Sequence, residues 1–194
     1  MPRILCYGDS NTYGYDPRSW FGGRYPKQTR WTGRLSESGY DVINEGENGR
    51  TIPVSEWMLE RTLAVFQHHE PFDLLCVMLG SNDLLSIPAA TAYDVTERMD
   101  AFLTYMLEGE PGMEVLLLAP PAMHRGEWVT EDRLITESAR MSECYRELAA
   151  QHGILFADAE AWGIETGFDG VHYTENGHAA FAEGIGQFLR ANGF

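Results

Sequence analysis

The sequence predicts an α/β fold, a three-layer α/β/α sandwich built around a five-stranded parallel sheet. Short apolar runs alternate with segments of helical periodicity, which is the pattern of parallel strands joined by crossover helices. Two runs, Asp73–Leu79 and Glu114–Ala119, are apolar almost throughout, as is typical of strands covered on both faces. Glycines and small polar residues follow several runs, at the edge of the sheet where ligand-binding loops gather.

The strands are the short apolar runs themselves, whose lengths suit strands better than helices. In chain order the predicted strands are Arg3–Tyr7, Asp41–Glu45, Asp73–Leu79, Glu114–Ala119 and Ile154–Ala157.

The helices lie between these strands. A short helix is expected at Trp31–Ser38, and the helix at Ser55–Glu70 begins at a serine suited to capping its N-terminus. Thr91–Glu108 and Glu131–His152 each place apolar side chains on one face, and the glycine that follows the second suits a helix end. A last helix is expected at about Thr174–Ala191.

Length and charge narrow the classes of function. The chain has 194 residues, which fits a single domain, 1–194, large enough to bury a core. Its 29 acidic and 14 basic residues give a formal net charge of -15, which argues against nucleic acid and anionic membrane surfaces as partners. No apolar run approaches the ~20 residues that span a bilayer. Three scattered cysteines and a start without a signal-peptide pattern favour a cytoplasmic protein.

A serine, a histidine and an aspartate are the candidate catalytic residues. Ser10 follows the first strand, where a turn into a helix would expose its hydroxyl. A serine hydroxyl becomes an effective nucleophile when a nearby base takes its proton. Asp169 precedes His172 by three residues, so a short loop would let the carboxylate accept the Nδ1–H and leave Nε2 free as the base. Taken singly, the same patterns also suit a helix cap and an ordinary polar loop.

Three groups are candidates for stabilising the oxyanion of a tetrahedral intermediate. These are the backbone N–H groups of Ser10 and Gly49 and the side-chain amide of Asn82. Gly49 follows the second strand and has no side chain to block an approaching substrate, and Asn82 lies at the exit of the third strand. Each such donor contributes about 3 kcal/mol to transition-state stabilisation. The alternative interpretations are a turn glycine and an Asx turn.

Four sequence blocks resemble the conserved blocks of the SGNH, or GDSL, hydrolases in order and position: YGDSNTYG, NGRT, MLGSNDL and DGVHYTENGH. They extend from Gly8 to His178, which is nearly the full chain. The resemblance implies a serine esterase with a flavodoxin-like strand order 2-1-3-4-5. The resemblance makes Ser10 the nucleophile, His172 the base and Asp169 the acid that orients it. It makes Ser10, Gly49 and Asn82 the oxyanion donors.

A narrower resemblance is to the bacterial arylesterase and acyltransferase branch. Arg30-Trp31-Thr32-Gly33 and the Glu45-Gly46 pair before Asn48-Gly49-Arg50-Thr51 are similar to that branch. It implies action on small esters, acyl transfer to alcohols, and a homo-oligomer.

Other constellations are weaker. The chain lacks the G-x-S-x-G, H-E-x-x-H, P-loop and dinucleotide-binding patterns, so neither a cofactor nor a metal is expected. His68-His69-Glu70 lies at a helix end, where adjacent side chains do not share a face. Asp158 is a second candidate for the triad acid, and His178 is expected to be structural. Asp9 and Asp83 are expected to brace the loops of the site.

The expected substrate is a small-molecule ester with a short acyl group, on an aryl or carbohydrate alcohol. Exposed aromatic rings suit such groups, and the loop aromatics expected to flank the site are Tyr13, Tyr15, Trp20, Phe21, Tyr25 and Trp128. The candidate substrate contacts are Asp9, Tyr13, Trp20 and His124. Two other functions stay open: a catalytically silent binding module on the same fold, and a lysophospholipase-type lipase. The net charge and the lack of an amphipathic anchor argue against the lipase.

Overall fold

The computed structural model describes residues 1–19 and 21–194. Trp20, one of the predicted substrate contacts, therefore lies outside the described residues. One parallel sheet has the strand order β2-β1-β3-β4-β5, which confirms the order implied by the resemblance. The ends of all five strands agree with the sequence predictions to within one residue: β1 (Arg3–Gly8), β2 (Asp41–Gly46), β3 (Leu74–Met78), β4 (Val115–Ala119) and β5 (Leu155–Asp158).

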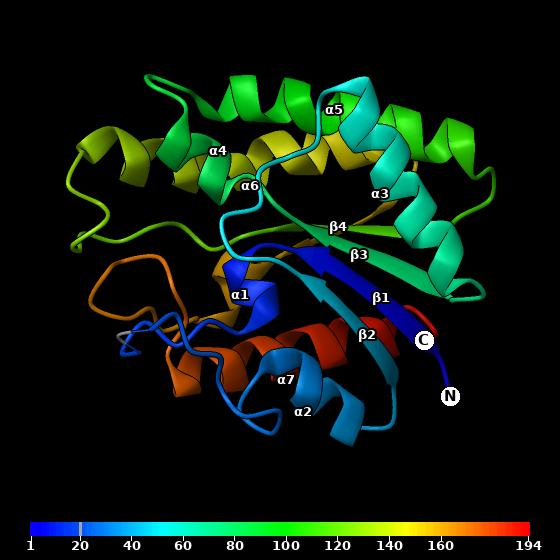
Figure 1. The fold of residues 1–194 in the computed structure, drawn as a ribbon, viewed down its shortest axis with the longest axis horizontal. Helices are drawn as coiled ribbons and strands as arrows, with labels where there is room; N and C mark the ends of the chain where they lie inside the picture. The colour runs from blue at the N-terminus through cyan, green and yellow to red at the C-terminus, as the bar shows by residue number, and fades with distance from the viewer. Residues whose placement is uncertain (20) are drawn as a thin grey trace.

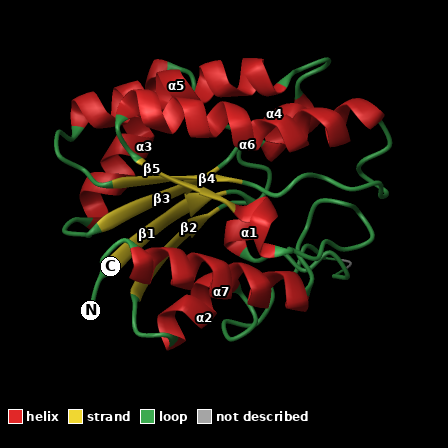
Figure 2. Ribbon diagram, turned by 180° about the vertical axis from the view of Figure 1, so that it is seen from behind, coloured by secondary structure: helices red, strands yellow, loops and turns green. Residues whose placement is uncertain are grey.

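Helices cover both faces of the sheet, as Figures 1 and 2 show from opposite sides. One face carries α3 (Glu56–His69), α4 (Ser81–Ser86), α5 (Ala92–Gly109) and α6 (Asp132–His152). The other face carries α1 (Ser10–Tyr13), α2 (Trp31–Glu37) and α7 (Glu175–Ala191). None of the helices in the described parts of the chain combines the length and apolarity needed to cross a membrane.

Two short helical segments were not predicted: α4 and the 3-10 helix η1 (Ala159–Trp162). Each is at most six residues long. A segment of that length is too short to show a repeating apolar face, so periodicity does not reveal it.

The predicted helix signals act as expected. The hydroxyl of Ser55 accepts a hydrogen bond from the backbone N–H of Met58 at the start of α3. A reciprocal capping box of Thr91 and Asp94, which was not predicted, also begins α5. Gly153 takes the left-handed conformation, with φ of 67°, and ends α6. These local signals explain why the helix boundaries were readable from sequence.

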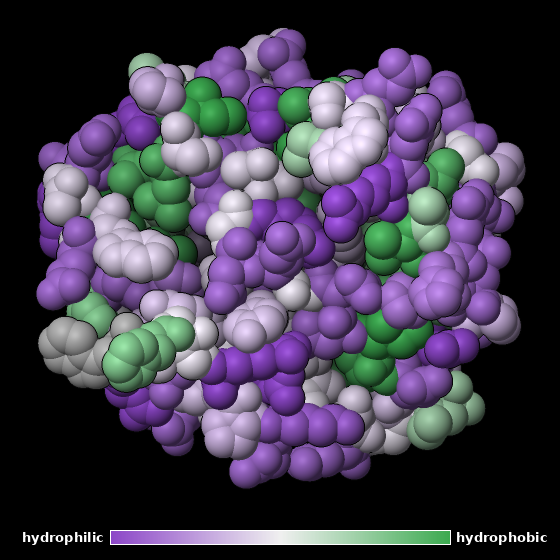
Figure 3. Space-filling view, in the orientation of Figure 1, coloured by the Kyte–Doolittle hydropathy of each residue, from purple (hydrophilic) through white to green (hydrophobic). Residues whose placement is uncertain are grey.

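The core is divided between the two faces of the sheet. Because side chains alternate along a strand, Leu5 and Tyr7 pack toward α3 and α5, whereas Ile4 and Cys6 pack toward α2 and α7. The outer surface on the face seen in Figure 3 is mainly hydrophilic, with small separate apolar areas. The carboxyl ends of the strands meet at one edge of the sheet, opposite the two chain termini (Figure 1).

A close backbone contact fixes the position of α1 on the sheet. Gly46, at the end of β2, is so near α1 that a Cβ atom there would lie 2.1 Å from the backbone nitrogen of Tyr13. The side chain of Asn44 donates hydrogen bonds to the carbonyl of Thr12 and the hydroxyl of Thr32, both at 2.7 Å. Helix α1 therefore sits against β2 without a side chain between them.

Replacing Gly46 by alanine tests this contact. We expect Gly46→Ala to lower the free energy of unfolding by about 1–3 kcal/mol, because backbone atoms must move apart. Urea denaturation measures the change. The matched control is Gly186→Ala in α7, where the nearest atom is the mobile end of Arg190 at 3.3 Å. That variant should be neutral or more stable, since alanine favours a helix over glycine. Equal effects of the two substitutions would contradict the contact.

Candidate active site

Ser10 begins α1 immediately after the turn that leaves β1. Asp9 is the N-cap of this helix, and its carboxylate accepts a hydrogen bond of 2.9 Å from the backbone N–H of Asn11. Gly8 has no room for a side chain, because a Cβ atom would lie 2.2 Å from the hydroxyl of Thr12 and 2.9 Å from the carbonyl of Met78. The glycine thus permits the sharp turn that places Ser10 at the carboxyl edge of the sheet.

The structure brings Ser10, His172 and Asp169 into one hydrogen-bonded line. The Nε2 atom of His172 lies 2.9 Å from the Ser10 hydroxyl oxygen, and its Nδ1 atom lies 2.7 Å from an Asp169 carboxylate oxygen. The other Asp169 oxygen accepts hydrogen bonds from the backbone N–H groups of Val171 and His172, both at 2.9 Å. In this geometry the histidine can take a proton from the serine.

Two buried carboxylates of the site have opposite pKa shifts. Burial raises the pKa of Asp169, but hydrogen bonds from His172 and Val171 outweigh burial and leave the pKa below its ordinary value. Burial raises the pKa of Asp9 to about 6, and the hydrogen bond from Asn11 offsets only part of that effect. Asp169 is therefore held as an anion beside the imidazole, which favours proton transfer to His172.

The side chain of Asn11, which sequence reasoning missed, connects the serine to the histidine loop. Its Nδ2 donates to the carbonyl of Val171 at 3.1 Å, and its Oδ1 accepts from the backbone N–H of Tyr173 at 3.0 Å. These are the two residues on either side of His172. One buried amide thus fixes the histidine peptide to the helix that carries Ser10. The only sequence signal was the position of Asn11 directly after the serine.

A second contact holds the aspartate from the opposite side. The backbone N–H groups of His124, Glu127 and Trp128 donate to the carbonyls of Gly170, Phe168 and Asp169, at distances of 3.0–3.1 Å. The side chain of His124 is exposed to solvent. Its contact with substrate remains a prediction. A Cβ atom on Gly126 would lie 2.5 Å from the Asp169 carbonyl oxygen. Glycine at this position lets the two loops pair.

Two aromatic rings flank the imidazole. The Tyr15 ring centroid lies 4.5 Å from that of His172, and the Trp128 ring lies 4.8 Å away and nearly perpendicular. Trp128 is half exposed, so part of its ring faces solvent beside the site. The expectation for Tyr25 was wrong, because its side chain is only 3% exposed and packs against the buried His178.

The other predicted substrate contacts lie in different settings. Tyr13 has the guanidinium of Arg24 over its ring, at 4.3 Å from the centroid. Asp9 is buried, which agrees with a bracing role, and its direct contact with substrate remains a prediction. Asp83 also acts as a brace: its carboxylate accepts from the Ile52 backbone N–H and from the Arg98 guanidinium.

The three predicted oxyanion donors follow β1, β2 and β3 at the same sheet edge. Gly49 has φ of 73°, a conformation that favours glycine. The Asn82 side-chain amide donates one hydrogen to the carbonyl of Arg50 at 3.1 Å, which leaves its second hydrogen available. Among the described residues, none accepts a hydrogen bond from the backbone N–H of Ser10 or Gly49. These donors can therefore bind an oxygen atom of a ligand.

The rival residues lie elsewhere in hydrogen-bonded roles. Asp158 accepts from the hydroxyl of Ser142 and from the backbone N–H of Glu160, while Asp169 contacts the histidine. His178 is buried, and its Nδ1 accepts from the backbone N–H of Trp31. His69 contacts the carboxylate of Glu45 at 2.7 Å. Within residues 1–19 and 21–194, no group of three or more His, Cys, Asp and Glu side chains could hold a metal ion.

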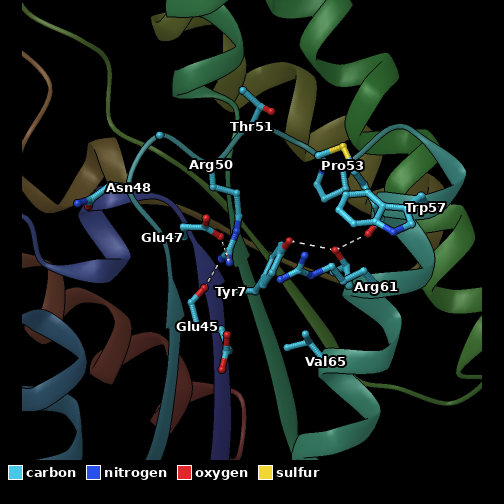
Figure 4. Close-up of a pocket in the computed structure, with 13 residues that line it drawn as sticks. Tyr7, Glu45, Glu47, Asn48, Arg50, Thr51, Pro53, Trp57, Arg61 and Val65 are labelled. Atoms are coloured by element: carbon cyan, nitrogen blue, oxygen red, sulfur yellow. Dashed lines mark hydrogen bonds and ion pairs between the residues drawn. The ribbon is translucent and has the colours of Figure 1, made fainter.

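A cleft of about 480 Å³ includes the predicted oxyanion donor Gly49 in its lining (Figure 4). The ends of β1 and β2, the loop after β2 and helix α3 line it. Gly49 and Arg50 belong to the wall of this cleft, whereas Ser10 and His172 do not. The cleft is therefore distinct from the immediate surroundings of the hydrogen-bonded line.

Comparisons with known proteins agree with this geometry. Residues 6–180 match the model of the GDSL-like Lipase/Acylhydrolase family. The chain belongs to this family. The protein is thus a carboxylic ester hydrolase with the SGNH hydrolase fold. No curated protein matches its sequence.

Solved structures of esterases resemble this chain over nearly its whole length. The native M. smegmatis aryl esterase is 26% identical with a TM-score of 0.85, over 98% of this chain and 99% of that chain. Est24, a carbohydrate acetylesterase from Sinorhizobium meliloti, is 25% identical with a TM-score of 0.84, over 99% and 100% of the two chains. A carbohydrate acetylesterase family member from Sinorhizobium meliloti is 29% identical with a TM-score of 0.83, over 98% of each chain.

The Asn11 bridge predicts a coupled loss of stability and activity. We expect Asn11→Ala to lower the free energy of unfolding by about 2–4 kcal/mol, since two buried backbone groups lose their partners. It should also lower kcat for p-nitrophenyl acetate at least tenfold, because His172 is no longer fixed relative to Ser10. The control Asn44→Ala removes three side-chain hydrogen bonds, to Thr12, Thr32 and Gly46, but none to the His172 loop, and should keep most of kcat. An equal loss of kcat in both variants would refute the bridge.

The raised pKa of Asp9 predicts the pH dependence of stability. The Asp9 carboxyl group binds its proton more tightly in the folded protein than in the unfolded chain. Its contribution to the free energy of unfolding is therefore complete below pH 3.8 and is lost as the pH rises through about 6. At about 1.4 kcal/mol for each pH unit, the buried charge costs about 3 kcal/mol at neutral pH. Asp9→Asn should therefore stabilise the fold at pH 8 and have little effect at pH 4, as measured by urea denaturation.

A control with the opposite sign is available in α5. The pKa of Asp94 is lowered by hydrogen bonds from Thr91, so Asp94→Asn should weaken the fold at pH 8. If Asp9→Asn changes stability equally at pH 4 and pH 8, the assigned pKa of Asp9 is wrong.

Proposed function

We propose that this protein is a serine esterase that hydrolyses short-chain acyl esters of aryl or carbohydrate alcohols through an acyl-enzyme. The observation that carries the proposal is the hydrogen-bonded line from the Ser10 hydroxyl through His172 to Asp169. A serine in this arrangement has both a base to receive its proton and a carboxylate to stabilise the resulting imidazolium. Membership of an acylhydrolase family supports the same chemistry.

The first half of the reaction forms the acyl-enzyme. The Ser10 oxygen attacks the ester carbonyl carbon while His172 Nε2 takes the hydroxyl proton. The carbonyl oxygen becomes an oxyanion, which accepts hydrogen bonds from the Ser10 and Gly49 N–H groups and the Asn82 amide. The intermediate then expels the alcohol, and His172 returns the proton to the departing oxygen.

The second half restores the free serine. A water molecule gives a proton to His172 as its oxygen attacks the acyl carbon. The tetrahedral intermediate uses the same three donors and collapses to release the carboxylic acid. Ser10 recovers its proton from His172. When an alcohol takes the place of water, the product is a new ester, so the proposal includes acyl transfer.

The substrate class rests on the surroundings of His172 and on similarity to known esterases. Tyr15 and Trp128 offer aromatic surface beside the imidazole, which suits the ring of an aryl or sugar alcohol. The structurally similar proteins include an aryl esterase and carbohydrate acetylesterases. A cytoplasmic location and a homo-oligomeric state are further parts of the proposal. The buried free thiols of Cys6 and Cys76 support the location.

Replacing the nucleophile tests the proposed reaction. We expect the wild type to hydrolyse p-nitrophenyl acetate faster than the butyrate, and the octanoate slowest. Ser10→Ala should lower kcat at least about 10³-fold, since binding and the oxyanion donors alone give little turnover. A fluorophosphonate should phosphonylate the wild type only, with loss of HF, so that the protein gains the mass of the reagent less that of HF.

The matched control is Ser36→Ala in α2, whose hydroxyl contacts only the carbonyl of Thr32 among the described residues. It should keep wild-type rates. If the wild type and Ser10→Ala are equally slow with all three esters, the esterase proposal fails and a catalytically silent binding module becomes the better account.

A further inference from the structure

We propose that Arg50 is a positioning residue that keeps the three oxyanion donors in fixed relative positions, although it is not part of the hydrogen-bonded line of Ser10, His172 and Asp169. This inference rests on the proposed esterase function. The donors follow three different strands: Ser10 begins α1 after β1, Gly49 lies in the loop after β2, and Asn82 lies in the first turn of α4 after β3. Arg50 lies in the loop after β2, and it contacts the ends of β1 and β2 through its side chain and Asn82 through its backbone.

The side chain of Arg50 joins the ends of β1 and β2. Its Nη1 donates to the carbonyl of Gly8 at 2.9 Å and also to the carbonyl of Glu45. Its Nη2 contacts the carboxylate of Glu47 at 2.9 Å (Figure 4). The guanidinium lies over the ring of Tyr7, with 4.1 Å between its carbon and the ring centroid. Only 14% of the side chain is exposed, so its conformation is closely constrained.

The backbone of Arg50 contacts the third donor, the side-chain amide of Asn82. Its carbonyl oxygen accepts the hydrogen bond from the Asn82 side-chain amide at 3.1 Å. Its nitrogen belongs to the peptide group that follows Gly49 and donates to the carbonyl of Glu47 at 3.3 Å. The residue therefore orients the Asn82 amide directly and limits the rotation of the loop that carries the Gly49 N–H.

Ser10 is connected to the same residue through the strand end. The carbonyl held by Arg50 is that of Gly8, two residues before Ser10. Gly8 also pairs with Gly46 and Met78 in the sheet, so this strand end is already ordered. The ordered end of β1 thus anchors the guanidinium. The guanidinium in turn restrains the more exposed turn that contains Gly49.

Arginine suits this role for a chemical reason. Its planar guanidinium carries five N–H donors in a fixed arrangement and can hold two carbonyls and a carboxylate at once. The lysine ammonium is a single centre on a flexible chain and cannot reproduce that geometry. The oxyanion hole depends on donor positions to within a fraction of an ångström. Loss of the guanidinium should therefore weaken binding of the transition state and have much less effect on binding of the ester.

The kinetic test compares Arg50→Ala and Arg50→Lys with a matched control. We expect Arg50→Ala to lower kcat for p-nitrophenyl acetate by about 10²-fold, close to the loss of one oxyanion donor, with KM within about threefold of wild type. Arg50→Lys should restore folding stability and little of the kcat. The control is Arg61→Ala, which removes an exposed arginine from the same cleft and should keep the wild-type kcat.

Two further measurements separate positioning from general stability. A trifluoromethyl ketone, which forms a tetrahedral adduct with the serine, should lose affinity for Arg50→Ala by the same factor as kcat/KM. Guanidinium ion at millimolar concentration should raise the kcat of Arg50→Ala, because the open cleft admits it to the vacated position. It should have no such effect on Asn82→Ala. The melting temperature of each variant shows that the enzyme assayed is folded.

The outcomes distinguish the two proposals. If the wild type shows Ser10-dependent turnover but Arg50→Ala keeps its kcat, or Arg50→Lys matches the wild type, the role of Arg50 is refuted alone. A loss of kcat without a parallel loss of ketone affinity also refutes it. If turnover in the wild type does not depend on Ser10, both proposals fail.

Discussion

The hydrogen bonds of the Asn11 side chain are the interaction on which the site depends. They join α1 to the peptide groups on either side of His172, across about 160 residues of sequence. The helix α1 is itself only four residues long, and the histidine loop has no regular structure of its own. Neither segment would fix the distance between Ser10 and His172 alone, so the buried amide joins the short helix and the histidine loop into one unit.

Three glycines allow close packing of backbone segments around this unit. Gly8 permits the turn before Ser10, Gly46 lets α1 lie against β2, and Gly126 lets its loop pair with Asp169. At each position an added Cβ would overlap a backbone or neighbouring side-chain atom. These glycines are selected by space rather than by backbone conformation, since none of the three has a positive φ. The site is thus built by packing loops against a sheet edge.

Hydrogen bonding and burial have opposite net effects on two carboxyl groups at the same edge. Asp169 is kept ionised by three hydrogen bonds, whereas Asp9 sits in a buried position that raises its pKa to about 6. The fold therefore tolerates a destabilising carboxyl group beside the catalytic line. Asp9 also caps α1, so its cost in stability accompanies the alignment of the helix that begins at Ser10.

The sequence by itself determined the strands, the longer helices, their caps and the residues that now form the hydrogen-bonded line. Periodicity and capping are local, and parallel strands bring their carboxyl ends together, so Ser10, Gly49, Asn82, Asp169 and His172 could be assigned to one edge. Only the tertiary structure decided which partners hold them. Asn11, Arg50 and Gly126 act through backbone atoms of residues distant in the chain, and Tyr25 is buried by such contacts although it lies in a loop. No sequence pattern records these pairings, because hydrogen bonds to backbone groups leave the identity of the partner residue free.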